Sequence, residues 1–166
     1  MTTPAAAPLA PPASPALALL GHAGIAARIP HHGRMCLLHS MQAWSAEHIL
    51  CTAVSHRDPA HPLLAGGVLW SACAIEYASQ AMALHGVLSA AEGAVPRAGF
   101  LASVRGVQLL VPRLDTVPGA LQVAAYRLAG DARQASYRFE LHSQAGVLLA
   151  AGRASVILDA MPQPTV

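Results

Sequence analysis

The sequence predicts an α+β fold in which one antiparallel sheet wraps around a single long helix. Residues 68–88 are rich in Ala, Leu, Met and Ile, contain no proline and are apolar on every side, which is typical of a buried helix. Residues 136–142 alternate instead between apolar and polar side chains, as in a strand with one buried face. Because only one helix is available to cover the apolar side of the strands, the sheet must curve around it.

Six strands are expected around this helix. Two precede it with a short polar turn between them, and a loop punctuated by proline and glycine, residues 56–67, leads into the helix. Four strands follow, and the short turns at residues 129–132 and 143–146 predict hairpins. The C-terminal half is therefore predicted to be an antiparallel meander. The expected strands are residues 35–44, 48–55, 100–111, 120–129, 136–142 and 146–158.

Residues 18–160 are expected to form one domain. Residues 1–17 hold five of the thirteen prolines among alanines, a composition that predicts a disordered tail, and residues 161–166 predict a flexible C-terminal end. The tail lacks the positive charge of a secretory leader, and no uninterrupted apolar run reaches the roughly 18 residues of a membrane span. We therefore expect a cytoplasmic protein with no membrane span.

The composition excludes several classes of function. A net charge of +2 built from few charged residues gives no basic patch for nucleic acid. Every one of the ten basic residues is Arg, which excludes enzymes that depend on a lysine amine. The three cysteines form no C-x-x-C pair and the nine histidines no H-E-x-x-H motif, so neither a disulfide framework nor a metal site is expected. With 54% hydrophobic and 11% charged residues, self-association is expected to cover apolar surface.

Glu76 is the only charged residue between Pro59 and Ala91, and it lies in the middle of the predicted helix. Burial of a lone carboxylate is unfavourable unless its pKa rises or it finds partners, so an isolated buried Glu is a candidate for proton transfer. Gln80 lies one helical turn further on, where its amide can orient the carboxyl group. The simpler alternative is a Glu on a solvated face of the helix.

A second candidate is the histidine pair that precedes the first strand. His31 and His32 follow Pro30, which restrains the loop backbone, and an imidazole in such a loop can act as a base near neutral pH. The alternative is a pair of ordinary surface histidines.

Three segments together resemble the β-hydroxyacyl-acyl-carrier-protein dehydratases, which have the hotdog fold. Residues 29–38 (IPHHGRMCLL) are similar to the Leu-Pro-His opening of that family. Residues 61–69 (HPLLAGGVL) are similar to its loop ending in Pro-Gly-Val-Leu, and residues 74–82 (AIEYASQAM) to its Glu-x-Met-Ala-Gln-Ala helix. The segments occur in the order of the family, and the resemblance covers residues 25–158.

The resemblance implies a role for each matching residue. His31 matches the catalytic histidine, Glu76 the catalytic carboxylate and Gln80 the glutamine that supports it. Gly66 and Gly67 match the loop whose backbone N–H groups face the thioester carbonyl.

Two departures from the common pattern stand out. His32 replaces a usual arginine, which leaves open whether His31 or His32 is the base. Glu76 lies nine residues after Gly67 instead of five, a spacing more similar to the branch found in aryl polyene gene clusters.

The implied reaction is dehydration of 3-hydroxyacyl thioesters to trans-2-enoyl thioesters, in fatty-acid or aryl-polyene-type biosynthesis. It needs no cofactor: a neutral His31 takes the C2 proton, and a Glu76 kept protonated by apolar surroundings donates to the leaving hydroxyl. The substrate would arrive on the phosphopantetheine arm of an acidic acyl carrier protein. Candidates to contact that carrier are Arg28, Arg34, Arg97 and Arg105.

Two other functions remain open, namely a hotdog acyl thioesterase and a catalytically silent hotdog subunit that pairs with an active dehydratase. We expect a homo-oligomer, a dimer or higher, or a heterodimer with a related hotdog subunit. The resemblance implies that His31 of one chain and Glu76 of the other form each site.

Overall fold

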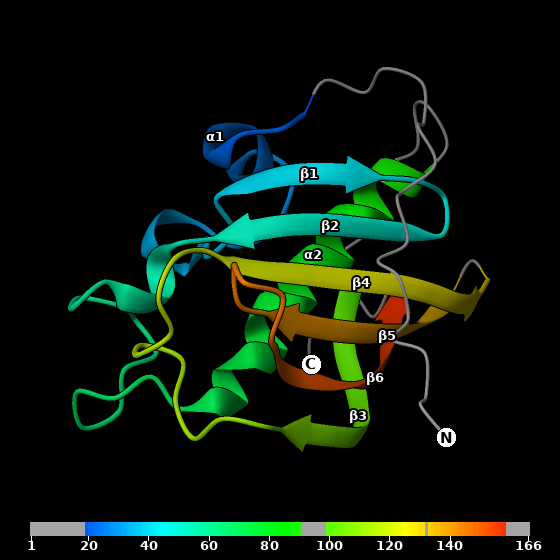
Figure 1. Cartoon of the computed structure of the whole chain (residues 1–166). Coiled ribbons are helices and arrows are strands. Elements are labelled where there is room, and N and C mark those ends of the chain that lie inside the picture. The colour runs from blue at the N-terminus through cyan, green and yellow to red at the C-terminus, as the bar shows by residue number, and fades with distance from the viewer. Residues whose placement is uncertain (1–18, 91–98, 132, 159–166) are drawn as a thin grey trace, which may run out of the picture.

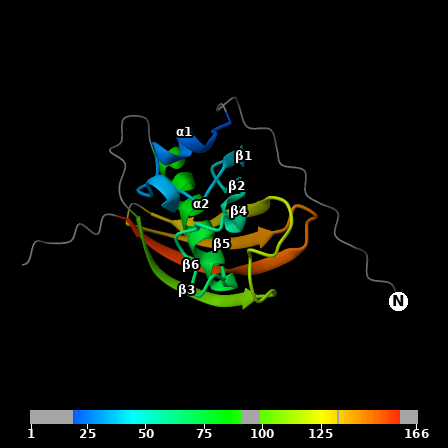
Figure 2. The same cartoon turned by 90° about the vertical axis from the view of Figure 1, so that its left-hand side faces the viewer.

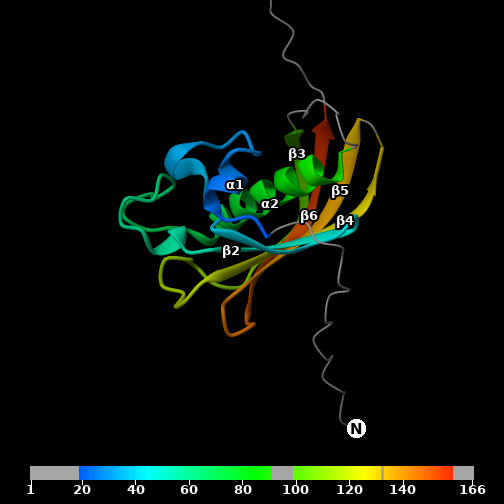
Figure 3. The same cartoon turned by 90° about the horizontal axis from the view of Figure 1, so that it is seen from above.

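The computed structural model describes residues 19–90, 99–131 and 133–158. Its long helix, α2 (Ala74–Ser89), lies on the concave side of a six-stranded antiparallel sheet with the strand order β1-β2-β4-β5-β6-β3 (Figures 1 and 3). Figure 2 shows the sheet curling around this helix. The predicted α+β architecture is therefore confirmed. The strands are β1 (Ser40–Trp44), β2 (His48–Ala53), β3 (Gly99–Leu109), β4 (Leu121–Gly130), β5 (Gln134–His142) and β6 (Leu148–Leu158).

The predicted tail and C-terminal end, residues 1–17 and 161–166, lie outside the described residues. The described part also contains a short helix, α1 (His22–Ala26), and single 3₁₀ turns at Gly33–Met35, Ser55–Arg57 and Ser71–Cys73. None of the helices in the described ranges is long and apolar enough to cross a bilayer.

The predicted meander is confirmed only for β4, β5 and β6, which follow one another through tight turns. Strand β3 was expected within that meander, but it pairs with β6 at the far edge of the sheet. This placement provides hydrogen-bond partners for one side of β6, whose backbone groups would otherwise lie along an open edge. Tyr137, Phe139 and Leu141 of β5 are buried as the alternation predicts.

Helix α2 begins at Ala74, six residues later than predicted. Leu69 and Trp70 are not helical because they pair with a distant segment: the Leu69 N–H donates to Asp115 Oδ1 at 3.2 Å, and Leu69 O accepts the Leu114 N–H at 2.8 Å. Trp70 forms a β-bridge with Arg113. These long-range hydrogen bonds satisfy backbone groups that a longer helix would otherwise use.

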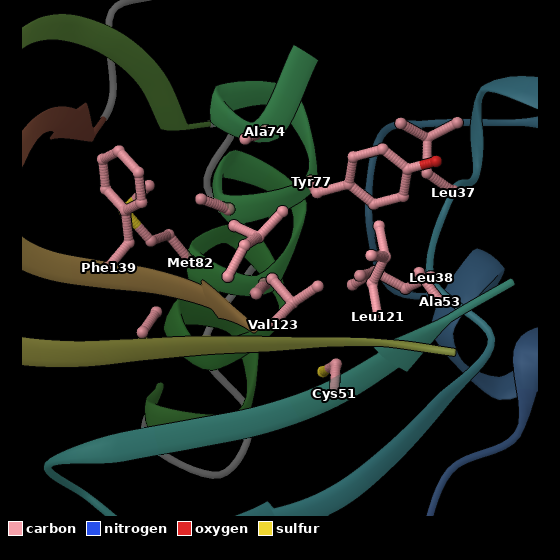
Figure 4. Packing of buried hydrophobic residues seen from close by; sticks show 14 of the residues in the cluster. Leu37, Leu38, Cys51, Ala53, Ala74, Tyr77, Met82, Leu121, Val123 and Phe139 are labelled. Atoms are coloured by element: carbon pink, nitrogen blue, oxygen red, sulfur yellow. The ribbon is translucent and has the colours of Figure 1, made fainter. Parts of the chain in front are cut away.

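The core lies between α2 and the strands that curve around it. Figure 4 shows Tyr77 of the helix turned toward Leu37, and Met82 packed toward Phe139 of β5. The largest buried side chains each contribute about 1.5–3 kcal/mol to folding, so the helix is held firmly against the sheet. The residues at the beginning of α2 are positioned by this packing.

Candidate active site

The beginning of α2 meets the loop that carries the predicted histidine. Glu76 lies in the first turn of the helix, and its Oε1 is 3.1 Å from His31 Nε2. Gln80, one turn further on, donates from Nε2 to the same carboxylate oxygen at 2.9 Å. The structure therefore brings together three of the predicted residues, and Glu76 and Gln80 are related by the predicted one-turn spacing.

Gln80 is fully buried and connects the helix to the chain that follows His31. Its Oε1 accepts the Leu37 N–H at 2.8 Å, and its Nε2 also donates to Met35 O at 2.7 Å. Because an N–H group faces one side of the amide and two oxygen acceptors face the other, the orientation of the amide is determined. Gln80 thus holds both the Glu76 carboxylate and the loop of His31.

His31 and His32 have different surroundings. The side chain of His31 is 25% exposed and lies against Glu76, whereas His32 is exposed. His31 Nδ1 is buried without a hydrogen-bond partner within the described residues. An imidazolium would leave an unpaired N–H there, so the neutral ring with its proton on Nε2, donated to Glu76, fits the site best.

The pKa of the Glu76 carboxyl lies below its ordinary value. The main cause is the hydrogen bond from His31; burial acts in the opposite direction, and the Gln80 hydrogen bond adds to the lowering. The expectation of a Glu76 kept protonated by apolar surroundings is therefore wrong, because two donors compensate for the partial loss of solvent. Glu76 is a carboxylate that accepts hydrogen bonds.

Both members of the pair belong to one chain. This differs from the expectation that each site combines His31 of one chain with Glu76 of another. The physical reason is the Gln80 amide, which binds the backbone at Met35 and Leu37 and so holds the preceding loop against its own helix.

Gly66 and Gly67 form a tight turn closed by a β-bridge between Ala65 and Val68. Their φ angles are +60° and +75°, a region that glycine adopts without strain. Both residues are exposed, and within the described residues neither N–H donates to a backbone carbonyl. No hydrogen bond in this part of the chain joins the turn to His31, Glu76 or Gln80.

A directional series of hydrogen bonds, not predicted from the sequence, lies beside this site. The Leu63 N–H donates to His61 Nδ1 at 3.1 Å, so His61 Nε2 carries the proton that it donates to Tyr77 OH at 3.0 Å. Tyr77 then donates to Ser55 Oγ at 2.9 Å, and Ser55 donates to Leu37 O at 3.0 Å. Burial lowers the pKa of His61, which agrees with a neutral ring. Two features of the sequence could have indicated these hydrogen bonds. His61 lies in one of the three segments that resemble the dehydratase family, and Tyr77 is adjacent to Glu76 in the helix.

A pocket of about 230 Å³ adjoins the hydrogen bonds of His61 and Ser55. Its lining residues include Arg34, Asp58, His61 and Pro62. Arg34 is thus the one arginine of the four predicted carrier contacts that lines it within the described residues. Arg28 donates to Gly24 O in α1, Arg105 lies on β3, and Arg97 is outside the described residues.

Comparisons with known proteins identify the family and the fold of this chain. The model of the ApeP-like family, described as ApeP dehydratase, matches residues 23–164. Among solved structures, the dehydratase heterocomplex ApeI:P from Xenorhabdus doucetiae is similar, with 25% identity and a TM-score of 0.69 over 84% of this chain and 91% of that chain. A search of curated proteins found no match.

More distant solved structures share the fold. AziG from S. sahachiroi has 15% identity and a TM-score of 0.56, with 73% of this chain and 90% of that chain covered. A thioesterase from Haemophilus influenzae has 15% identity and a TM-score of 0.56, with 78% and 82% covered. Together with the sheet and helix described above, these likenesses confirm the hotdog fold.

Proposed function

Because this chain belongs to the ApeP-like dehydratase family, the aryl polyene branch expected from its sequence, we propose that its substrates are 3-hydroxyacyl thioesters on an acyl carrier protein. The products are trans-2-enoyl thioesters. The observation that carries the proposal is the His31–Glu76 pair, with 3.1 Å between Nε2 and Oε1, held by a buried Gln80. A proton donor and acceptor in contact at the end of a buried helix suit a reaction that moves one proton.

The elimination breaks the C2–H and C3–O bonds and forms a C2=C3 double bond. The electron pair of C2–H becomes the new π bond, and the C3–O pair leaves with the hydroxyl. We propose that the His31–Glu76 pair accepts the C2 proton and returns it to the departing hydroxyl, which leaves as water. This path does not require Glu76 to be protonated before the reaction begins, which agrees with a Glu76 pKa below its ordinary value.

Charge that develops on the thioester oxygen requires N–H donors. We assign this role to the backbone of Gly66 and Gly67. In support, both residues are exposed, and neither N–H donates to the backbone within the described ranges. Positive φ angles at both positions also favour glycine, whose lack of a side chain allows a substrate to approach closely.

The proposed assembly is a dimer or higher oligomer joined at sheet edges, either of this chain alone or with a related hotdog subunit. Strand β3 is an edge strand, and Leu101, Leu109 and Leu110 on or beside it are exposed. An exposed apolar edge invites pairing with another strand. The similar ApeI:P protein is a dehydratase heterocomplex, which supports the mixed form.

The free Cys36, Cys51 and Cys73 suit the reducing cytoplasm, where we place the protein.

Two thioester substrates test the proposal. The full chain, alone and with a related hotdog subunit, is incubated with crotonyl and with saturated acyl thioesters on a carrier protein. Hydration of the crotonyl thioester, lost in His31→Ala and retained in His32→Ala, is the expected result. Release of free thiol from the saturated thioester instead indicates a thioesterase. Hydration only with the second subunit present, and unaffected by His31→Ala, indicates a silent subunit.

A further inference from the structure

Three arginines lie side by side on the outer face of the sheet, away from α2. Arg138 of β5 pairs with Arg153 of β6, and Arg153 pairs with Arg105 of β3. These residues share a face because directly paired residues of antiparallel strands point to the same side. That side is the outer one, since Tyr137 and Phe139, the neighbours of Arg138, are buried in the core. Figures 1 and 3 show the three strands adjacent on this side of the sheet.

Only one of the three arginines has an anionic partner within the described residues. The Arg138 guanidinium lies 4.1 Å from the centre of the Tyr126 ring and pairs with Glu140. Arg105 and Arg153 are exposed and take part in no ion pair in the described ranges. Like charges directly opposite one another destabilise a sheet. A row of three arginines therefore favours the binding of an acidic partner, which removes this repulsion.

Two further sets of cross-strand pairs lie next to the arginines on the outer face, one of serines and one of apolar residues. Two residues along each strand lie Ser136, Ser155 and Ser103, which pair across the same three strands. Beyond the serines lie Ile157, two residues from Ser155, and Phe100, three residues from Ser103 because the register of β3 shifts between Leu101 and Ser103. Phe100 and Ile157 pair with each other and are exposed by 48% and 44%. The outer face thus presents a cationic row, a row of short hydroxyl side chains and an apolar pair, in that order.

These spacings match one α-helix that crosses the strands above the serine row. Adjacent strands are about 4.8 Å apart, close to the pitch of about 5.4 Å, so carboxylates one helical turn apart can meet successive arginines. Rows two residues apart are separated by about 6.8 Å, so the arginines and the apolar pair lie on opposite flanks of a helix about 10 Å wide. The short serines leave the backbone of such a helix room to approach.

We propose that this outer face of the sheet is a docking surface for an acidic, amphipathic helix of a partner protein. One side of that helix carries carboxylates one turn apart, which pair with Arg105 and Arg153 beside the already paired Arg138. The other side carries an apolar residue that covers Phe100 and Ile157. This surface lies on the side of the sheet opposite α2, so the inference does not depend on the proposed reaction.

Two labelled synthetic helices of equal composition test this inference with the full chain. The first carries Glu at one-turn spacing on one side and Leu on the other; the second has the same residues scrambled around the helix. In fluorescence anisotropy titrations we expect the first helix to bind at least about tenfold more tightly, and more weakly as salt increases. Equal binding of both helices would mean general charge attraction and would overturn the proposal.

Matched variants locate the binding. Arg105→Glu with Arg153→Glu should weaken binding of the first helix at least about tenfold, whereas Arg57→Glu, the same charge change on an exposed 3₁₀ turn, should not. Ser155→Phe keeps the charge but fills the space above the serine row, and it should also weaken binding. Unchanged affinity in the arginine variant, or in the milder Arg105→Gln with Arg153→Gln pair, refutes the proposal. A changed oligomeric state of these variants in sedimentation would assign the surface to a second copy of this chain instead.

Discussion

Replacement of Gln80 by Met removes the group that connects α2 to the loop of His31. Methionine has a similar volume, so the packing of the fully buried site changes little. The Leu37 N–H loses its acceptor in a buried position, which costs about 1–3 kcal/mol, and Met35 O loses a hydrogen bond worth about 1 kcal/mol. We therefore expect Gln80→Met to lower the free energy of unfolding by about 2–4 kcal/mol. For a domain of this size that corresponds to a melting temperature lower by about 5–15 °C.

The same substitution changes how stability depends on pH. The pKa of Glu76 in the folded chain is lowered, so its ionisation stabilises the fold above the pKa of the unfolded chain, and this contribution is lost as pH falls through the folded pKa. Without the Gln80 donor, the pKa of Glu76 is lowered less. The acid side of the stability curve and of the pH–rate profile should therefore move to higher pH in Gln80→Met.

Urea unfolding at a series of pH values, together with pH–rate profiles, measures both effects. Ser79→Ala is a suitable control because Ser79 is next to Gln80 in the helix, but its hydroxyl donates only to Ile75 O within the described residues. The contrary result would be a Gln80→Met protein with the same free energy of unfolding and the same acid limb of the pH–rate profile as Ser79→Ala. It would show that the Gln80 amide holds neither the His31 loop nor the Glu76 carboxylate.

Further substitutions separate the roles of the site residues. His31→Ala should abolish dehydration and leave the fold intact, whereas His32→Ala should retain most activity; the reverse result in thioester assays would exchange their roles. Glu76→Gln keeps the shape but cannot accept a proton, so the rate should fall at least about a hundredfold, and near-normal turnover would make Glu76 structural. Co-refolded His31→Ala and Glu76→Ala chains should regain no activity, because the pair is formed within one chain; recovery of about a quarter of the wild-type rate would point to sites shared across a two-fold interface. Tyr77→Phe leaves the buried His61 Nε2–H unpaired and should reduce unfolding free energy by about 1–3 kcal/mol, measured by urea denaturation.

The central helix and its carboxylate were predictable because their signals are local. An apolar stretch of helical length was visible without any knowledge of the strands, and Glu76 was the only charge within it. The pairing of Gln80 with Glu76 followed from the one-turn spacing. The place where the helix begins was not predictable, since it depends on hydrogen bonds between Leu69 and a segment some 45 residues away, at Leu114 and Asp115.

The errors at the site have a common physical origin. The apolar neighbours of Glu76 in the sequence suggested a raised pKa, but the two donors that lower it come from His31, far along the chain, and from Gln80. The position of β3 beside β6 is equally non-local. Sequence periodicity determines which face of a strand is buried, while the neighbour of that strand depends on how the backbone groups of the whole sheet are satisfied.

Both backbone polar groups of Leu37 are hydrogen-bonded: its N–H donates to Gln80, and its C=O accepts from Ser55. Ser55 in turn is bound by Tyr77, and Tyr77 by His61. The carboxylate, the first loop and the loop of His61 should therefore open as one cooperative unit in hydrogen exchange, with the Leu37 amide reporting its free energy. Any change that loosens the His61 loop will increase the time that Glu76 spends without its fixed donors. Exchange at one amide thus measures how long the whole site stays assembled.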